Sequence, residues 1–170
     1  MLATGPTVRR IEPAGTRLTP ALDDDDAALL RQAEAGQTLA FERIAWRYDE
    51  AILSWLLMLT GSEQEALVLC RATFVTAYRE LARRDTPSLY VWLYRIAAEQ
   101  WLRRRERRHD RPSAGGALAR LSTQEVLVYT LKAGQGLSLR TVAQILNAPG
   151  DTVARTFCQA IAKLQVAGGR

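Results

Sequence analysis

The sequence predicts an all-α protein built from two small helical domains that a short linker joins. Apolar residues recur at helical spacing along most of the chain, and no segment convincingly shows the alternation of a β-strand. A break with Pro and paired Gly at residues 109–116 separates four expected helices from a shorter helical unit. We therefore expect a disordered segment at 1–22, a domain at 23–108, a linker at 109–116 and a domain at 117–170.

The first expected helix covers about residues 25–35. It follows the acidic run from Asp23 to Asp26, whose carboxylates suit the free amides and the dipole at a helix N-terminus, and it stops at Gly36. The second helix begins at Thr38, which we expect to be its N-cap, and stops at Thr60-Gly61.

The third helix opens with Ser62 and Glu65, a capping box in which hydroxyl and carboxylate satisfy free amides reciprocally. A loop at 82–88 leads to a fourth helix, expected at about Leu89–Arg108. Helical spacing predicts the inner face of each of these helices. The second helix is expected to bury Phe41, Ile44, Ala45, Tyr48, Ile52, Leu56 and Leu59, and the third Ala66, Cys70, Phe74, Ala77, Tyr78 and Leu81. The fourth is expected to bury Leu89, Leu93, Ile96 and Ala97.

The second domain is expected to hold a helix-turn-helix. Its first helix opens with a second capping box, Ser122 to Glu125, and stops at Gly134-Gln-Gly136. Ser138 caps a short helix that runs to Leu146, and after a tight turn the last helix begins at Asp151 or Thr152. Two short helices joined in this way are typical of DNA-binding domains, although other three-helix bundles share the pattern.

Charge is distributed unevenly along the chain. Residues 1–94 hold 10 Lys+Arg and 13 Asp+Glu, whereas residues 95–170 hold 13 Lys+Arg and 5 Asp+Glu. The net balance is therefore −3 in the first part and +8 in the second, and only two of the 23 cations are lysine. A basic, arginine-rich half favours a polyanionic partner, while the alternative is arginine used for solubility alone.

Seven arginines gather in the window 95–111 beside two tryptophans, Trp92 and Trp101. Arginines neutralise phosphates and aromatic rings stack on unpaired bases, so this helix end favours a nucleic-acid contact. The alternative is a solvated helix end favoured by the dipole. We expect Trp101 to be exposed and Trp46, Trp55 and Trp92 to lie in the core or at an interface.

The string Trp92-Leu-Tyr-Arg-Ile-Ala97, with Asp26-Ala-Ala-Leu-Leu before it and Thr152-Val153 after it, resembles the extracytoplasmic-function sigma factors of bacterial RNA polymerase. The resemblance covers about residues 24–166. It implies that the first domain is of the sigma region 2 type, which binds the polymerase clamp and melts and reads the −10 element. It implies that the second domain is of the region 4 type, which reads the −35 element.

The resemblance, the arginine pattern at the end of the fourth helix and the position of residues in the expected helix-turn-helix together predict roles for individual residues. Those expected to bind polymerase are Leu67, Val68, Arg71 and Phe74. Those expected to bind DNA are Arg95, Trp101, Arg103, Arg104, Arg107, Arg108, Arg111, Arg140, Thr152 and Arg155.

Three stretches depart from the family pattern. Ala66 to Arg71 replaces a run with two acids and a Gln that usually engages the clamp, and Leu67 to Leu69 make this face apolar. Glu99 stands where a polar Asn is usual, and Arg155 is the only cation near the start of the last helix. We therefore expect a more hydrophobic clamp contact and a single base-reading arginine.

Enzymatic functions find no support in the residues. His109 is the only histidine and falls in the linker, no glycine-rich phosphate loop occurs, and the carboxylates are scattered. We expect no catalytic residue, no metal site and no cofactor. Cys70 and Cys158 both fall in apolar helical patterns, so we expect buried, reduced thiols.

The most apolar stretch, Ala51 to Leu59, is far shorter than the ~20 residues a membrane helix needs. The N-terminus lacks a basic-then-apolar signal pattern, so we expect a cytoplasmic protein without membrane insertion.

Three hypotheses for the function remain open. The first is a DNA-binding sigma factor, monomeric when free, that recruits RNA polymerase core to promoter DNA and initiates transcription. The second is a degenerate sigma-like protein that acts by protein contact, for example by capturing an anti-sigma factor. The third is an unrelated helix-turn-helix regulator.

Overall fold

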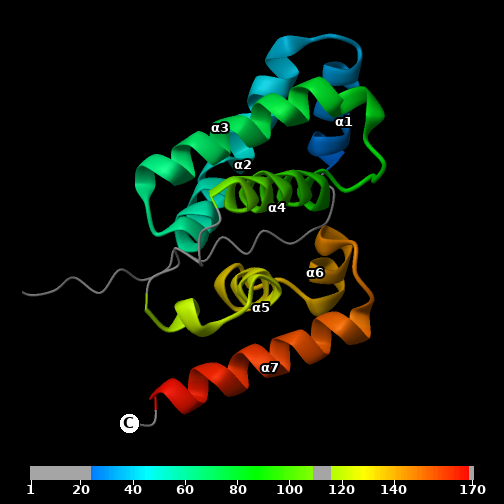
Figure 1. Ribbon diagram of the computed structural model, residues 1–170. Coiled ribbons are helices and arrows are strands. Elements are labelled where there is room, and N and C mark those ends of the chain that lie inside the picture. Colours follow the sequence, from blue (N-terminus) through cyan, green and yellow to red (C-terminus); the bar gives the residue numbers. More distant parts are fainter. Residues whose placement is uncertain (1–23, 109–115, 169–170) are drawn as a thin grey trace, which may run out of the picture.

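The computed structural model describes residues 24–108 and 116–168, and its regular elements in these ranges are all helical (Figure 1). The prediction of an all-α protein is confirmed. The segment expected to be disordered, 1–22, lies outside the described residues, as does all but the last residue of the expected linker. The helices are α1 Asp24–Glu34, α2 Thr38–Thr60, α3 Glu63–Glu80, α4 Leu89–Arg108, α5 Thr123–Tyr129, α6 Leu139–Leu146 and α7 Gly150–Gly168, with short turns η1 Leu81–Arg83, η2 Gly116–Arg120 and η3 Thr130–Gly134.

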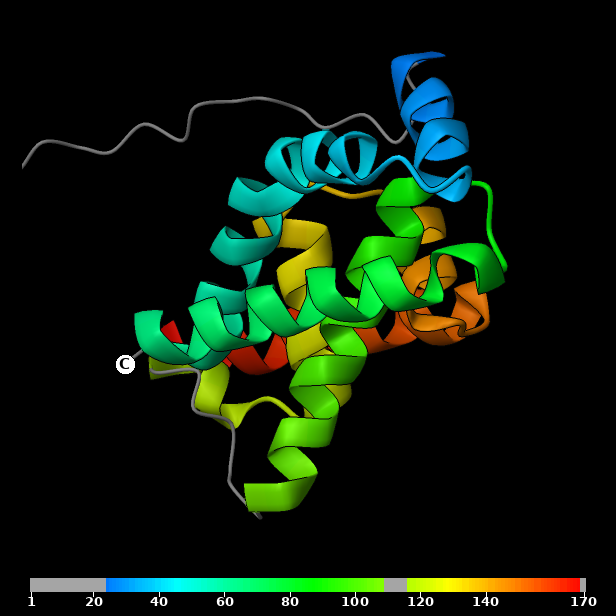
Figure 2. The ribbon, with the colours of Figure 1, turned by 90° about the horizontal axis from the view of Figure 1, so that it is seen from above.

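Helices α1 to α4 form the N-terminal half, in which α2 packs between α1 and α3 and α3 packs on α4. Seen from above, α3 crosses over α4, with α5, α6 and α7 behind them (Figure 2). The N-cap position of α2 is Gln37, which makes no side-chain cap, so Thr38 is its first helical residue rather than the expected cap. At the other end Gly61 adopts φ 64°, and its N–H donates to the Leu57 carbonyl at 2.8 Å. A left-handed glycine at this place ends the helix because it reverses the chain without steric cost.

The buried face of α3 differs from the expected one. Leu69 and Thr73 are buried together with Ala66, Cys70 and Ala77, whereas Tyr78 is exposed and Phe74 only partly buried. The face is set by packing against both α2 and α4, which rotates it toward Leu69. Tyr78 still contacts the core through its edge, because its ring centroid lies 5.2 Å from that of Phe41.

Helix α4 is buried on nearly all sides over its first three turns. Ten of its residues are buried, from Leu89 to Trp101. The cause is that α3 and α2 cover one side of α4, and α6 covers another. Such a helix carries no polar stripe along this stretch: Arg95 is its one charged residue before Ala98, and the other charged residues of α4 come after Ala98.

The C-terminal half comprises η2, α5, η3, α6 and α7. The capping box predicted at Ser122 and Glu125 is present in full, and Ser138 caps α6 by accepting from Thr141 N at 3.0 Å. The chain turns out of α5 through a π-helical turn, η3, in which Gln135 N donates to Thr130 O at 2.9 Å. Helix α7 starts at Gly150, one residue before the expected start.

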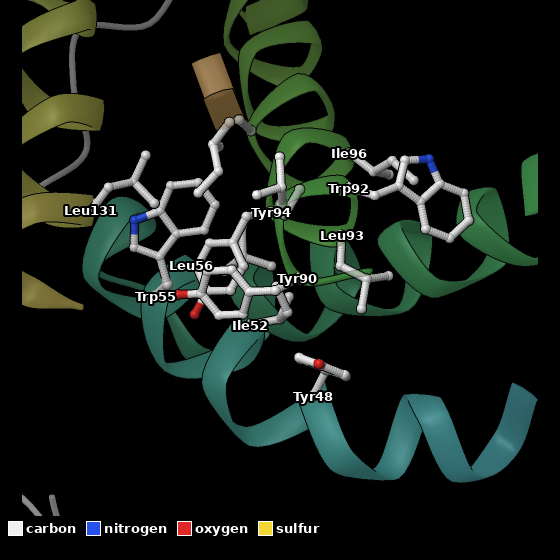
Figure 3. Close-up of a cluster of buried hydrophobic side chains, with 14 of the residues drawn as sticks. Tyr48, Ile52, Trp55, Leu56, Tyr90, Trp92, Leu93, Tyr94, Ile96 and Leu131 are labelled. Atoms are coloured by element: carbon white, nitrogen blue, oxygen red, sulfur yellow. The ribbon is translucent and has the colours of Figure 1, made fainter. Parts of the chain in front are cut away.

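The two halves pack on each other and share one continuous hydrophobic core. Helix α4 lies against α6, and the end of α2 lies against η3. Figure 3 shows Leu131 of the C-terminal half beside Trp55 and Tyr94 of the N-terminal half. The boundaries of the two expected domains stay a prediction, since the core runs across them. In the residues described, no helix has the length and hydropathy that a membrane crossing requires.

One member of the acidic run has a tertiary role that the helix-start interpretation did not include. Asp26 is buried; its carboxylate accepts from Tyr48 Oη at 2.5 Å and forms an ion pair with Arg47. Its neighbour Asp25 is exposed and lies 3.8 Å from Arg47 Nη2. Asp26 therefore ties α1 to α2.

We predict that Asp26→Asn lowers the free energy of unfolding by about 2 kcal/mol, since hydrogen bonds to charged groups contribute about 1.5–3 kcal/mol. Asp25→Asn is the matched control and should change stability by less than about 0.5 kcal/mol, as exposed pairs do. Urea unfolding followed by circular dichroism measures both. Equal effects of the two substitutions would contradict the role assigned to Asp26.

A second prediction concerns pH. Burial raises the pKa of the Glu125 carboxyl, but hydrogen bonds from Lys163 Nζ and from the Ser122 backbone outweigh burial and hold the pKa below its usual value. A lowered pKa in the folded state contributes stability that is present above the unfolded-chain pKa of about 4.3 and is lost as pH falls through the folded-state pKa. Glu125→Gln should therefore be less stable at pH 7 and should lose less stability on acidification. Unfolding curves between pH 7 and pH 3 test this, with the exposed Glu50→Gln as control; parallel pH profiles for wild type and Glu125→Gln would refute it.

Candidate nucleic-acid interface and protein-binding surface

The last two turns of α4 carry half of the arginines predicted to bind DNA, namely Arg103, Arg104, Arg107 and Arg108. Arg103 and Arg107 are exposed. Arg103 pairs with Glu99 one turn back at 3.3 Å, and Arg104 Nε donates to Glu65 of α3 at 2.7 Å. Glu99, the unusual residue at its position, therefore orients an arginine at the surface. The side chain of Arg108 and the whole of Arg111 lie outside the described part of the chain.

One tryptophan lies contrary to expectation, and a second lies outside the core. Trp101 was expected to be exposed, but its residue is only 3% exposed, and the Arg105 guanidinium lies over its ring, 4.7 Å from the centroid. Trp46 was expected in the core or at an interface, and its 88% exposure on α2 excludes the core. Residue type alone did not reveal which face of each helix its neighbours cover. Trp101 can stack on a base only if the Arg105 side chain moves away from its ring.

Arg95, also predicted to bind DNA, lies between the two halves. Its guanidinium donates to Asp85 Oδ2 at 2.7 Å and to the Gln144 carbonyl at 3.1 Å. Gln144 is in the last turn of α6, where a cation is favoured by the helix dipole. Arg95 borders an open groove of about 450 Å³ that Trp92 and Ile145 also line. In this arrangement it holds protein groups at the surface where the two halves meet.

In the C-terminal half, the predicted DNA-binding residues lie at the helix-turn-helix. Asn147 ends α6 at φ 48°, a left-handed conformation that Asn tolerates, and the chain then enters α7. Thr152 is half-buried in the first turn of α7, while Arg155 and Arg140 are exposed. A shallow groove of about 720 Å³ separates α6 from the start of α7, with Arg140 and Gln144 on one side and Ala154 on the other.

The outer face of α3 is more apolar than the sequence interpretation stated. Leu67 and Val68 are exposed as expected, but Leu69, which we grouped with them, is buried. Val75 and Tyr78 extend the exposed stripe, and sequence reasoning missed both. The signal was available: positions 68, 71, 75 and 78 recur at helical spacing and define a second stripe beside the core-facing one.

The two cysteines differ. Cys70 is buried and donates to Asp49 Oδ1 at 3.4 Å, and burial raises the pKa of its thiol to about 12. Cys158 is exposed on α7, so the expectation that it is buried was wrong. Within residues 24–108 and 116–168, no three His, Cys, Asp or Glu side chains lie close enough to hold a metal ion.

No protein-family model matches the chain. An RNA polymerase sigma-H factor from Pseudomonas aeruginosa is 33% identical over 75 residues. The matched segment covers 44% of this chain and 39% of the sigma-H factor, so it spans less than half the length of that relative.

Two solved structures share the fold over most of the chain. CnrH, in complex with the cytosolic domain of CnrY, matches with a TM-score of 0.71 and 26% identity, covering 85% of this chain and 97% of CnrH. The sigma factor RpoE, in complex with the anti-sigma factor NepR from Bartonella quintana, matches with a TM-score of 0.64 and 18% identity, covering 76% of this chain and 98% of RpoE. The second match supports the fold alone. The resemblance predicted from the Trp92–Ala97 string is thus confirmed: the chain is similar to the sigma factors of the extracytoplasmic-function type, in fold through both halves and in sequence over part of its length.

Proposed function

We propose that the chain is a sigma factor that recruits RNA polymerase core to promoter DNA and initiates transcription in the cytoplasm. The observation that carries this proposal is the match to CnrH, which extends over 85% of the chain and so includes both halves. The sequence match to a sigma-H factor supports it independently. The sigma factors that the chain resembles are non-enzymatic regulators of transcription, and we propose the same for this chain.

The arginines of α4 and α7 support a DNA-binding role. Arg103 and Arg107 lie exposed at the end of α4, where they can neutralise phosphates. Thr152 lies in the first turn of α7, where free amides favour phosphate, and Arg155 follows one turn later. In helix-turn-helix domains the first turns of the second helix meet base edges in the major groove, so Arg155 is the proposed base-reading residue.

The exposed stripe on α3 supports a polymerase-binding role. Val68, Val75 and Tyr78 present an apolar surface beside Arg71, on the side of α3 that faces away from the core. Contiguous apolar residues at a surface indicate a protein contact. We propose that this stripe, together with Leu67 and the partly buried Phe74, binds the polymerase clamp.

A second candidate function is capture of an anti-sigma factor without transcription initiation. The observation in its favour is that both solved neighbours are complexes, RpoE with the anti-sigma factor NepR and CnrH with a domain of CnrY. The apolar replacement of the usual clamp-binding acids also suits this function. Retention of core RNA polymerase by the tagged chain distinguishes the two, because only the first candidate requires it.

We predict that Val68→Asp weakens binding to core RNA polymerase about tenfold or more, since a charge is then desolvated against an apolar contact. Wild-type affinity should vary little with salt, because a hydrophobic contact is not screened. Val166→Asp is the matched control: Val166 is an exposed valine of the C-terminal half and should leave binding unchanged. A steep loss of wild-type binding between low and moderate salt would contradict the hydrophobic contact.

We also predict that two arginine variants weaken DNA binding in different ways. Arg107→Ala should lower affinity for all duplexes and reduce the slope of log affinity against log salt by about 0.7–0.9. Arg155→Ala should instead remove about 1–3 kcal/mol of discrimination between promoter and unrelated duplexes. Arg31→Ala, an exposed arginine of α1, is the control. Fluorescence anisotropy at several salt concentrations measures all three. Unchanged slope for Arg107→Ala, or unchanged discrimination for Arg155→Ala, would remove that residue from the interface.

A further inference from the structure

Helix α2 carries an apolar stripe on the side that faces away from the core. Leu39 and Trp46 are 73% and 88% exposed, and Leu57, 44% exposed, continues the same line past the half-buried Leu53. We call these four residues the outer stripe. They are spaced by seven, seven and four residues, so they share one face of the helix. Apolar side chains aligned at a surface in this way indicate a contact with another segment.

Acidic side chains border the tryptophan of the outer stripe. Glu42 lies one turn before Trp46 and Glu50 one turn after it, with Asp49 beside Glu50, and all three acids are exposed. Arg43 is exposed on the same border. Three acids and one arginine give the border a net charge of −2. An apolar face with an acidic border suits an occupant that is both apolar and basic.

The net charge of the chain changes sign where α1 begins. Residues 24–94 hold 7 Lys+Arg and 11 Asp+Glu, a balance of −4. Residues 1–22 hold three arginines and one glutamate, a balance of +2. Arg10 is followed by Ile11 and Arg17 by Leu18, so cations and apolar side chains alternate there. The segment that precedes α1 thus combines the two properties that suit the outer stripe and its border.

The start of α1 lies beside the turn of α2 that carries Trp46. Asp26, near the beginning of α1, forms an ion pair with Arg47, which directly follows Trp46. An open groove of about 360 Å³ lies between the two helices here, with Asp25 on one side and Arg43 on the other. Residues 1–22 are therefore joined to the rest of the chain next to the outer stripe.

We propose that the segment 1–22 covers the outer stripe of its own chain. Its arginines lie against the ring of Trp46 and the carboxylates of Glu42 and Glu50. Its apolar residues, Ile11 and Leu18, pack on the apolar side chains of the stripe.

The chemistry of this contact already occurs elsewhere in the chain. The Arg105 guanidinium lies over the Trp101 ring, 4.7 Å from the centroid. An arginine on an indole face is attracted by the electrons of the ring, and the attraction increases where nearby carboxylates add to the negative potential. Trp46 offers such a face beside two exposed acids, Glu42 and Glu50.

The short connection makes a weak contact sufficient. Leu18 is six residues before Asp24, so an extended chain places it up to about 20 Å from the start of α1. A segment joined this closely meets its site at an effective concentration of about 1 mM, so a contact with a Kd of about 0.1 mM is about nine-tenths formed. A second copy or a separate protein lacks this advantage at micromolar concentration. The attachment and the charge together favour the chain's own segment as the occupant.

The four tryptophans make the contact measurable in the full chain, without polymerase or DNA. Trp55, Trp92 and Trp101 are at most 4% exposed, so a neutral quencher such as acrylamide reaches mainly Trp46. The difference between wild type and Trp46→Phe isolates the fluorescence of Trp46. Its quenching constant then reports whether the outer stripe is covered.

We predict that acrylamide quenches Trp46 weakly in wild type. Reversing three charges in the segment, by Arg9→Glu, Arg10→Glu and Arg17→Glu together, should raise the quenching constant of Trp46 about fivefold, because a contact weakened tenfold is then only about half formed. The matched control makes the same change at three exposed arginines outside α2 and the segment, and should leave the constant unchanged; these are Arg79, Arg83 and Arg120.

A charge swap separates a direct contact from an effect on folding. Glu42→Arg with Glu50→Arg should also raise the quenching constant of Trp46, because the border then repels the segment. Combining these two substitutions with the three arginine reversals restores opposite charges and should restore the protection of Trp46. Disruption of the fold cannot produce such a rescue, and circular dichroism of each variant checks that the helices are intact.

Three results would overturn the proposal. Strong quenching of Trp46 in wild type would mean that the outer stripe is open in the free chain and available to a separate protein. Protection that is lost on dilution, with dissociation seen by sedimentation, would mean that a second copy covers the stripe, since a contact within one chain does not depend on concentration. Failure of the charge swap to restore protection would remove the arginines and acids from the contact. Protection that is independent of concentration, lost on charge reversal and restored by the swap supports docking of the segment.

Discussion

The hydrogen bond from the Trp55 indole to the Thr130 hydroxyl determines how the helices of the two halves can pack. An indole N–H inside an apolar core needs a partner, and the Thr130 hydroxyl accepts from it while donating its own hydrogen to Val126 O, so both groups are satisfied. The π-helical turn that begins at Thr130 brings Gln135 to Tyr94 and allows Met58 to approach Gly134. The register of the contact therefore follows from one buried polar pair, and the apolar contacts around it, such as Leu131 beside Trp55, fill the remaining space.

Helix α4 shows what this arrangement demands of the sequence. Its first part is covered by α2, α3 and α6, so its residues from Leu89 to Ala98 are almost uniformly buried. Apart from Arg95, the arginines of α4 come after Ala98, where the helix extends past its neighbours, and two of them bind Glu99 and Glu65. The end of the covered part of α4 also explains why Trp101 is buried. It lies at the last covered turn and is closed over by Arg105, so its ring belongs to the packed part of the helix.

Local signals predicted the helices well because caps and stops act within a few residues. The span Leu89–Arg108 agrees with the structure, and the capping box at Ser122 forms as expected. The predictions that Trp101 is exposed and that α3 buries Phe74 and Tyr78 were wrong, and Trp46 does not lie in the core, because burial depends on partners far along the chain. Nothing near Trp46 in sequence reveals that no neighbouring helix covers it, and nothing near Leu69 reveals how α4 rotates the buried face of α3. Contacts such as Arg95 with Gln144 join residues 49 apart and carry no periodic signal. The DNA-binding and clamp-binding residues remain predictions, since their partners are other molecules.

The contact between the halves is mainly apolar, with a few polar contacts inside it. Trp55, Tyr94 and Leu131 are fully buried there and belong to one hydrophobic core. Burial of apolar surface contributes about 25 cal/mol per Å², whereas a hydrogen bond contributes only about 1 kcal/mol and an accessible ion pair such as Arg95 with Asp85 contributes less. Apolar burial therefore supplies most of the attraction between the halves. The hydrogen bonds select one arrangement, because a shifted packing would leave a buried donor such as the Trp55 indole without an acceptor.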